Sequence, residues 1–285
     1  LTKNHTLLIL FVMFLLGSAY PTAKLGINAS MPPILFGSIR MGIVFICLVP
    51  FCKIYIPKKK YLLPLIAFSF SMGVGVNLFL YLSVKASSII SPLVIGAQLS
   101  IPIAIILSSI FIGESINYKK WILIITSFLG IVLIGFDPKI ADEILGFLLI
   151  CSMAFFYAMS QVFSRYLKEL DVKFTSASMG FVACIALLIF SIVFEGNTIS
   201  HLKNLNLQAW LMVLHAGILC SLFGHMTMFY LYKFYPVGQV LPFYALFPVF
   251  GMLLSFFIFG EIPTLIMVIG GIIVISSVFL LQKVR

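Results

Sequence analysis

Long runs of apolar residues alternate along this chain with short polar breaks. A membrane-spanning helix needs about 20 predominantly apolar residues, and each run is close to that length. The pattern therefore predicts ten spans, at residues 6–25, 33–52, 62–84, 88–111, 119–136, 144–164, 174–194, 208–232, 236–259 and 262–282. Ten such helices leave only short loops and no room for a catalytic domain outside the membrane.

The breaks between the runs are typical of loops, as in Asp137-Pro138 and Gly196-Asn197-Thr198. The first run also has features of a signal peptide, because Lys3 precedes it and Gly17-Ser18-Ala19 resembles a cleavage site. Against that alternative, the next span begins only a few residues after Lys24, and the first run has an internal counterpart in the second half of the chain.

Composition agrees with a membrane protein. Of the 285 residues, 62% are hydrophobic and 9% charged, with a mean hydropathy of +1.20. A soluble domain carries about 25% charged residues, so a soluble enzyme is excluded and an all-α, multi-pass membrane protein is expected. The five cysteines fall in or beside apolar runs without metal-ligand spacing, so neither a metal nor a cofactor is expected.

The net charge of +10 is not arranged for binding nucleic acid, since no basic run interleaves with aromatic residues. Lys and Arg instead indicate topology, because cytoplasmic loops are enriched in them. With the N-terminus inside, thirteen of the 18 lie on the cytoplasmic side, four lie outside, and Arg40 lies within a span. The outer four are Lys24, Lys85, Lys139 and Lys203. Both termini are therefore predicted to be cytoplasmic.

The chain repeats itself at an offset of about 141 to 148 residues. The matches pair Gly17-Ser18-Ala19-Tyr20 with Ala158-Met159-Ser160-Gln161, Asn77 and Tyr81 with His225 and Phe229, Gln98 and Pro102 with Tyr244 and Pro248, and Gly113-Glu114 with Gly260-Glu261. Each half holds five spans, an odd number, so the second half is predicted to enter the membrane in the opposite orientation. Inverted repeats are the architecture of many secondary transporters, whose substrate site lies near the midplane.

These features resemble the EamA family of the drug/metabolite transporter superfamily. The resemblance rests on Gly17-Ser18 with Lys24, on Arg40 after Pro32-Pro33, and on two blocks that end in Gly113-Glu114 and Gly260-Glu261. Leu16, Leu123 and Ser277 depart from the family's pattern. The resemblance implies two inverted five-helix repeats, at 1–140 and 141–285, around a cavity lined by spans one, three, four, six, eight and nine. It also implies a bacterial inner-membrane location and transport of amino acids, other metabolites or drugs, usually outward.

Polar side chains at membrane depth usually face a cavity or a partner helix. Gln98 and its repeat mate Tyr244 each lie one turn before a proline, so we predict a shared midplane site there, with Pro102 and Pro248 as hinges. The full set of predicted substrate-binding residues is Tyr20, Asn77, Tyr81, Gln98, Tyr157, Gln161, His225 and Tyr244. The alternative for Gln98 is a hydrogen bond to a neighbouring helix.

Other polar residues are assigned structural roles. Lys24, Lys85, Arg165 and Lys233 are interpreted as interfacial cations that snorkel to the membrane surface. Arg40 is expected to bind backbone carbonyls or to snorkel outward. Glu114 and Glu261 are expected to cap the loops that follow them. His215 and His225 lie on different faces of their helix, which excludes a metal pair.

The predicted function is secondary transport of small metabolites, amino acids or related amphipathic compounds, by alternating access, with export as the expected direction. The main alternative is an uptake permease or exchanger for a nucleotide-like or other environmental metabolite. A membrane-embedded enzyme is disfavoured, because its only candidates, Asp137, Asp142 and Glu143, have no His nearby. No span holds Asp or Glu, which favours a facilitator, an exchanger or coupling through His225. The expected partners are the substrate and the lipid bilayer, with the protein a monomer or weak homodimer.

Overall fold

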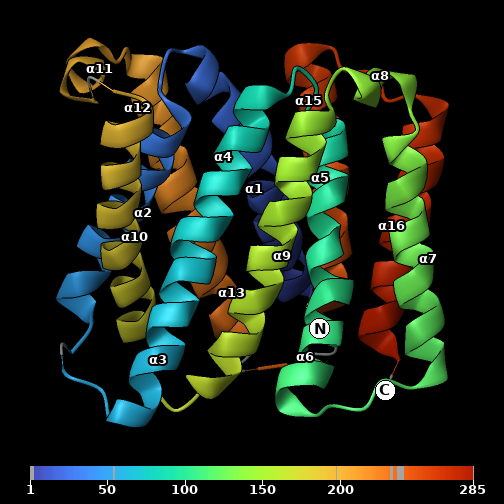
Figure 1. Ribbon diagram of the computed structural model, residues 1–285, viewed down its shortest axis with the longest axis horizontal. Coiled ribbons are helices and arrows are strands. Elements are labelled where there is room, and N and C mark those ends of the chain that lie inside the picture. The colour runs from blue at the N-terminus through green and yellow to red at the C-terminus, as the bar shows by residue number, and fades with distance from the viewer. Residues whose placement is uncertain (1–2, 54, 197, 232–233, 236–240, 285) are drawn as a thin grey trace.

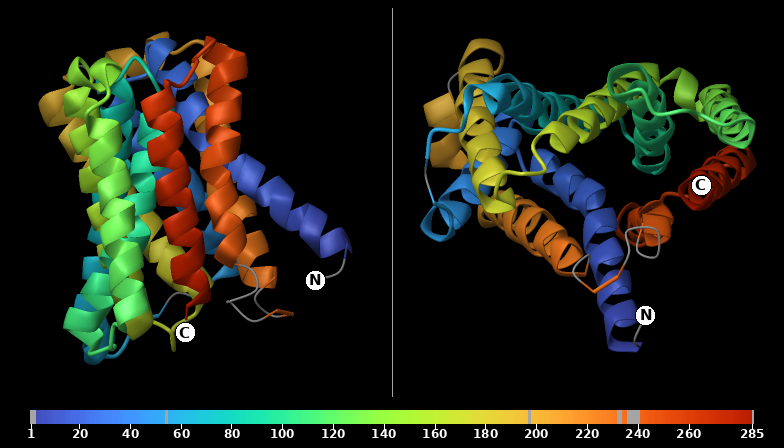
Figure 2. Two further views of the ribbon diagram at one scale, coloured as in Figure 1. Left: turned by 90° about the vertical axis from the view of Figure 1, so that its right-hand side faces the viewer. Right: turned by 90° about the horizontal axis from the view of Figure 1, so that it is seen from below.

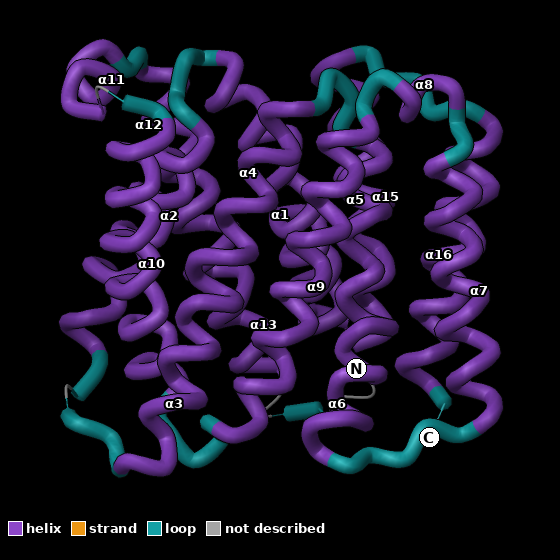
Figure 3. Tube along the Cα trace, viewed as in Figure 1, coloured by secondary structure: helices purple, strands orange, loops and turns teal. Residues whose placement is uncertain are grey.

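The computed structural model describes residues 3–53, 55–196, 198–231, 234–235 and 241–284, and within these ranges the chain is helical with no strand (Figures 1 and 3). Nine of the described segments are long and apolar enough to cross a membrane, and Phe243–Phe259 is a shorter apolar helix. They coincide with the ten predicted apolar runs to within a few residues. Residues 236–240, which begin the ninth predicted span, lie outside the described residues, as does Lys233.

The spans contain the following helical elements. The first half comprises α1 (Lys3–Asn28), α2 (Pro33–Leu48) with η1 (Val49–Phe51), α3 (Lys59–Phe68) with η2 (Ser69–Gly75) and α4 (Val76–Ala86), α5 (Ser91–Gly96) with η3 (Ala97–Leu99) and α6 (Ser100–Ile112), and α7 (Tyr118–Gly135). The short helix α8 (Pro138–Ala141) follows. The second half comprises α9 (Ile144–Tyr166), α10 (Val172–Phe194), α11 (Thr198–Asn204), α12 (Leu207–Leu214) with η4 (His215–Gly224) and α13 (His225–Leu231), η5 (Leu241–Leu246) with α15 (Phe247–Phe259), and α16 (Leu265–Lys283).

Matching residues begin and end matching helices of the two halves. The Asn117 side chain accepts from the Lys120 backbone amide at the start of α7, and Thr264 does the same for Met267 at the start of α16. The helices α6 and α15 both end at a left-handed glycine, Gly113 with φ 78° and Gly260 with φ 67°. A residue with a Cβ is disfavoured in that conformation, so these glycines set the helix ends.

Four spans are interrupted, in two matching pairs. The third and eighth spans contain the π-helical segments η2 and η4, and the fourth and ninth contain the 3₁₀ segments η3 and η5. Such segments interrupt the regular hydrogen-bond ladder and commonly mark functional sites or hinges. The irregular backbone is thus concentrated in the spans that the family resemblance places around the transport pathway.

The helices pack in an order that repeats between the halves (Figures 1 and 2). α2 packs against α10, and α7 against α16, each pairing one half with the other. α9 contacts α4 and α6, and its counterpart α1 contacts η4 and α15. Small residues permit close approach, since a Cβ on Gly17 would lie 2.6 Å from the Phe247 carbonyl oxygen. α1 is thus an integral bundle helix, with Ile9, Val12 and Met13 fully buried.

The outer faces of the helices are apolar. On α7, for example, Ile125, Leu129 and Val132 are all more than half exposed, which suits contact with lipid tails. All eight carboxylates of the chain lie outside the helices, in the loops and turns at the ends of the spans. The described termini lie toward the same end of the bundle, the lower end in Figure 1.

Candidate substrate site

Arg40 is a cation within the second span, seven residues after Pro33 and so roughly 10 Å along α2. Its Nε donates to the Ser221 hydroxyl at 2.9 Å, and its Nη1 donates to the Tyr81 hydroxyl at 2.8 Å and to Asn77 Oδ1 at 3.5 Å. The prediction that Arg40 binds backbone carbonyls or snorkels outward is therefore wrong. It joins side chains from both halves of the chain instead.

The π-helical segments position two of these partners. The Ser221 hydroxyl donates to the Ala216 carbonyl, five residues back in η4, at 2.9 Å. The Asn77 amide, just after η2, donates to the Met72 carbonyl five residues back at 3.3 Å and to Gly73 at 2.8 Å. A π-helical turn is wider than an α-helical one and pairs each residue with the carbonyl five residues back. The wide turns therefore hold Ser221 and Asn77 with their oxygens directed at Arg40.

The bonded partners of Arg40 are all neutral. The ion pairs among the described residues are Lys60–Glu169 and Arg165–Glu114, both at solvent-exposed ends of the bundle. A guanidinium at membrane depth costs several kcal/mol when nothing offsets its charge. Hydrogen bonds to a phenol, an amide and a hydroxyl offset part of that cost and leave the net charge in place.

Aromatic residues complete the surroundings of Arg40. Tyr20 on α1 and Tyr81 on α4 belong to one buried apolar cluster, and Tyr157 on α9 packs against that cluster. The Tyr20 ring stacks on Phe247 of α15, with centroids 6.4 Å apart and planes 9° apart. We refer to Tyr20, Arg40, Asn77, Tyr81, Tyr157 and Ser221 as the Arg40 cluster. It combines one positive charge with phenol and amide groups and with apolar ring faces.

A second polar group borders the Arg40 cluster between α1 and η4. The Ser18 hydroxyl lies 3.2 Å from His215 Nε2, and Cys220 Sγ lies 3.6 Å from His215 Nδ1. The Cys220 thiol also donates to the Leu15 carbonyl at 3.1 Å. These bonds connect the first span of one half to the eighth span of the other, and they occupy both His215 nitrogens.

The predicted pair Gln98 and Tyr244 lies elsewhere. Gln98 is 1% exposed in η3, which packs against α9, and neither atom of its amide has a hydrogen-bond partner among the described residues. Tyr244 lies in η5, and it packs against the apolar cluster around Ile9, Val12 and Met13. The two residues therefore face different neighbours. The His225 side chain lies outside the described residues, although the backbone of His225 begins α13.

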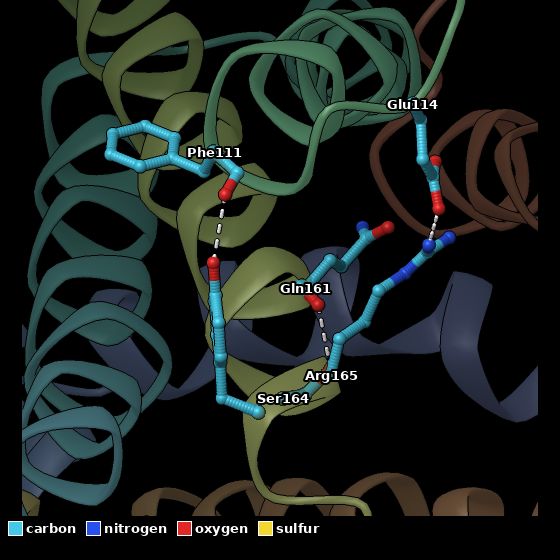
Figure 4. Close-up of polar contacts among 6 residues, drawn as sticks. Phe111, Glu114, Gln161, Ser164 and Arg165 are labelled. Atoms are coloured by element: carbon cyan, nitrogen blue, oxygen red, sulfur yellow. Dashed lines mark hydrogen bonds and ion pairs between the residues drawn. The ribbon is translucent and has the colours of Figure 1, made fainter.

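Four predicted residues do come together, namely Tyr20, Asn77, Tyr81 and Tyr157 in the Arg40 cluster. Gln161 is separate, near the lower end of α9, where its side chain extends to the same side as Arg165 (Figure 4). Arg165 pairs with Glu114, and the Tyr166 hydroxyl donates to the Phe111 carbonyl at 2.9 Å. A recess of about 380 Å³ lies at this end, lined by Ile112, Arg165, Tyr166 and Lys168.

A further contact joins the halves at the lower end. Glu169, in the turn after α9, accepts from the Tyr61 hydroxyl and pairs with Lys60 at 3.4 Å. The Tyr61 hydrogen bond, followed by the Lys60 charge, lowers the pKa of Glu169. Its carboxylate therefore stays ionised to a lower pH than usual.

At the upper end, carboxylates from the second half hold helix starts of the first half. Glu261 accepts from the Ile90 and Ser91 backbone amides at 2.8 and 3.1 Å, and Glu195 accepts from Ile34 and Leu35 at 2.7 and 3.0 Å. Free amides at a helix start carry partial positive charge and favour carboxylates.

Three structural assignments change as a result. Glu261 does not cap its own loop, because it binds the start of α5, and its repeat mate Glu114 pairs with Arg165 instead. Arg165 is therefore an ion-pair partner rather than a snorkelling cation. Lys24 donates to the Val84 and Ser87 carbonyls at the end of α4, so it caps that helix.

The fold and site together define a multi-pass helical membrane protein with a charged polar cluster between two related halves. The pattern of the EamA-like transporter family matches residues 4–136 and 144–282. The chain therefore belongs to that family.

Two individual proteins are also similar. The uncharacterized transporter YdfC of Bacillus subtilis (strain 168) is 25% identical over 179 residues, which cover 60% of this chain and 56% of that protein. The chain thus aligns with little more than half of that relative's length. A solved structure described only as "Crystal structure of protein" has a TM-score of 0.65 at 18% identity, over 97% of this chain and 96% of that one. That likeness extends over the whole fold and concerns the fold alone.

Proposed function

We propose that this protein is a secondary transporter that moves small amphipathic metabolites, amino acids or related compounds, across a bacterial inner membrane by alternating access, with export as its direction. The observation that carries the proposal is the Arg40 cluster. It lies at membrane depth, contains the charge and hydrogen-bonding groups that a small polar metabolite needs, and draws residues from both halves.

The repeated architecture supports alternating access. We infer that the halves are inverted repeats, because each holds five spans and the matching spans carry matching π and 3₁₀ segments. In such a transporter, one half rocks against the other around a fixed central site. The hydrogen bond between Arg40 and Ser221 joins the second span, in the first half, to the eighth span, in the second half. Movement of one half against the other would therefore reshape this site.

The charge distribution supports cytoplasmic termini. The end of the bundle that holds the termini contains Lys53, Lys58 and Lys168 in its loops and Lys173 in the first turn of α10. Five of the eight carboxylates, including Glu195 and Glu261, lie at the opposite end. Positively charged loops favour the cytoplasmic side. We propose that the lower end in Figure 1 faces the cytoplasm.

Counterflow in proteoliposomes tests transport directly. Vesicles loaded with one unlabelled compound should accumulate the same labelled compound from outside, across a panel of amino acids and their deaminated analogues. Ser221→Ala removes a hydroxyl that holds Arg40, and it should slow uptake for every substrate found. Lys203→Gln, which removes an exposed charge far from the cluster, is the control and should behave as wild type. Uptake equal to that of empty vesicles across the panel, with folded protein present, would refute the proposal.

A further inference from the structure

We propose that Arg40 binds the carboxylate of the transported compound, so that the site selects monocarboxylates with an apolar body whether or not they carry an ammonium group. The inference rests on the proposed transport function and assigns it a substrate class. It follows from the charge of the Arg40 cluster, from the unused donors of the guanidinium and from the apolar rings around it.

The charge argument begins with the distribution of carboxylates. All eight lie at helix ends or in loops, so none shares the depth of Arg40. A buried arginine without a counterion is costly, and membrane proteins retain such residues at substrate pathways. A bound anion would supply the missing counter-charge, and it would be attracted most strongly where water is excluded.

The geometry leaves donors available for that anion. Arginine has five N–H donors, and the three bonds to Ser221, Tyr81 and Asn77 employ only Nε and Nη1. Among the described residues, neither N–H of Nη2 has an acceptor. Residue Arg40 as a whole is partly buried, and its two Nη2 N–H groups are the donors left for an anion. The bonds on Nε and Nη1 hold the guanidinium, and with it the positive charge, in one orientation.

The surroundings restrict the class of anion further. One cation matches one negative charge, whereas a phosphate ester with two charges would leave one without a partner. Aromatic rings flank the cluster, with Phe36 4.6 Å from the Tyr81 ring and Phe247 stacked on Tyr20. They suit an apolar substituent. The Arg40 cluster contains no Asp or Glu to pair with the ammonium group of an amino acid. An ammonium group on the substrate should therefore add little to its binding free energy.

Thermal stabilisation of the purified full chain in lipid nanodiscs tests the assignment, since a ligand that binds the folded state raises the unfolding temperature. The probes share one apolar body: phenylalanine, 3-phenyllactate, phenethylamine and phenyl phosphate. Phenyllactate and phenylalanine should both stabilise the wild type, with phenyllactate at least equal to phenylalanine. Phenethylamine and phenyl phosphate should have little effect. Sodium chloride at equal ionic strength is the control for inorganic anions.

Variants then locate the effect. Arg40→Gln should weaken phenyllactate binding roughly thirtyfold or more, as loss of a buried charge partner does. Arg40→Lys keeps the positive charge but loses the planar array of guanidinium donors. Its affinity for phenyllactate should lie between those of Arg40→Gln and the wild type. Lys203→Gln is the matched loss of an exposed charge, and should bind as wild type. If Arg40→Gln does not fold, the comparison of phenyllactate with phenethylamine on the wild type still tests whether the site requires a carboxylate.

Several results would overturn the proposal: no stabilisation of the wild type by either carboxylate, equal stabilisation by phenethylamine, phenyl phosphate or chloride, or unchanged phenyllactate binding by Arg40→Gln. Because these measurements read binding alone, such results would leave the proposed transport activity standing. Binding of phenyllactate without counterflow of any compound would instead contradict transport and leave the Arg40 assignment intact.

Discussion

Single residues set how closely the two halves approach, and Gly17 shows this most directly. A Cβ at this position would lie 2.6 Å from the Phe247 carbonyl oxygen and 2.8 Å from the Gly251 nitrogen. Both are backbone atoms and cannot rotate away. We expect Gly17→Ala to separate α1 from α15 and to lower the free energy of unfolding by about 1–3 kcal/mol, the usual range for overpacking.

Thermal unfolding in detergent measures this effect, with Gly135→Ala as its control. A Cβ on Gly135 would meet the Phe147 ring at 3.7 Å, an ordinary contact. Alanine is also the better helix former, so the control should keep or slightly raise the unfolding temperature. Equal unfolding temperatures for the two variants would show that α1 and α15 do not pack as described.

Sequence spacing alone selected several residues that lie together in the structure. Tyr20, Asn77 and Tyr81 were selected because one-turn spacing places polar groups on one helix face. The structure bonds Asn77 and Tyr81 to Arg40 and places Tyr20 in the same core cluster as Tyr81. The role of Arg40 was missed because its partner Ser221 lies 181 positions away in sequence. An arginine in an apolar run, with no acid at its depth, was nevertheless a visible signal for a polar cluster inside the bundle.

At the scale of elements, the sequence predicted the spans well, because the bilayer demands long apolar runs. Prolines in the sequence also indicated where the helices of the fourth and ninth spans are interrupted. Pro102 and Pro248 lie in the first turns of α6 and α15, immediately after η3 and η5. Each removes the donor that would reach a carbonyl four residues back. The π segments had no comparable sequence signal, since no proline or glycine pattern specifies them.

We therefore expect Pro102→Ala and Pro248→Ala to slow counterflow more than they weaken binding. Alanine restores a helical hydrogen bond worth about 1 kcal/mol. If the helix must bend there during exchange, breaking that bond slows the step roughly fivefold. Pro33→Ala is the control, because a proline at the first position of α2 displaces no helical bond. Unchanged exchange rates in both variants, or an equal slowing by Pro33→Ala, would exclude these prolines as hinges.

At the scale of the whole molecule, the two ends of the bundle are held together differently. At the upper end, Glu261 bonds directly to the start of α5, and Asp137 accepts from the Thr264 hydroxyl. At the lower end, the Glu114 side chain is bound, within the described part of the chain, only through Arg165, and the side chains of Glu114 and Arg165 are 45% and 55% exposed. A repeat inferred from sequence could not reveal this asymmetry, because matching residues adopt different partners when the halves differ in conformation.

Because the two ends are held differently, Glu→Gln substitutions at the matching residues Glu261 and Glu114 should change cysteine accessibility in opposite directions. Glu261→Gln weakens charge-assisted bonds that close the upper end, and a loss of about 1.4 kcal/mol shifts an equilibrium tenfold. It should increase labelling of a cysteine at Thr22, toward the upper end of α1, and decrease labelling at Gln161. Glu114→Gln should do the reverse to a smaller extent, because exposed ion pairs contribute about 0–1 kcal/mol.

The labelling rates of the cysteines at Thr22 and Gln161 are measured with membrane-impermeant and permeant thiol reagents, in a variant that lacks the native cysteines. Asp142→Asn is the control, since it removes an exposed carboxylate from the upper end and should change neither rate. The sign of the two shifts is decisive, because the proposed inverted repeats, if they exchange conformations, would respond oppositely when matching residues are altered. Shifts in the same direction would mean that Glu114 and Glu261 do not hold opposite ends of one alternating-access cycle.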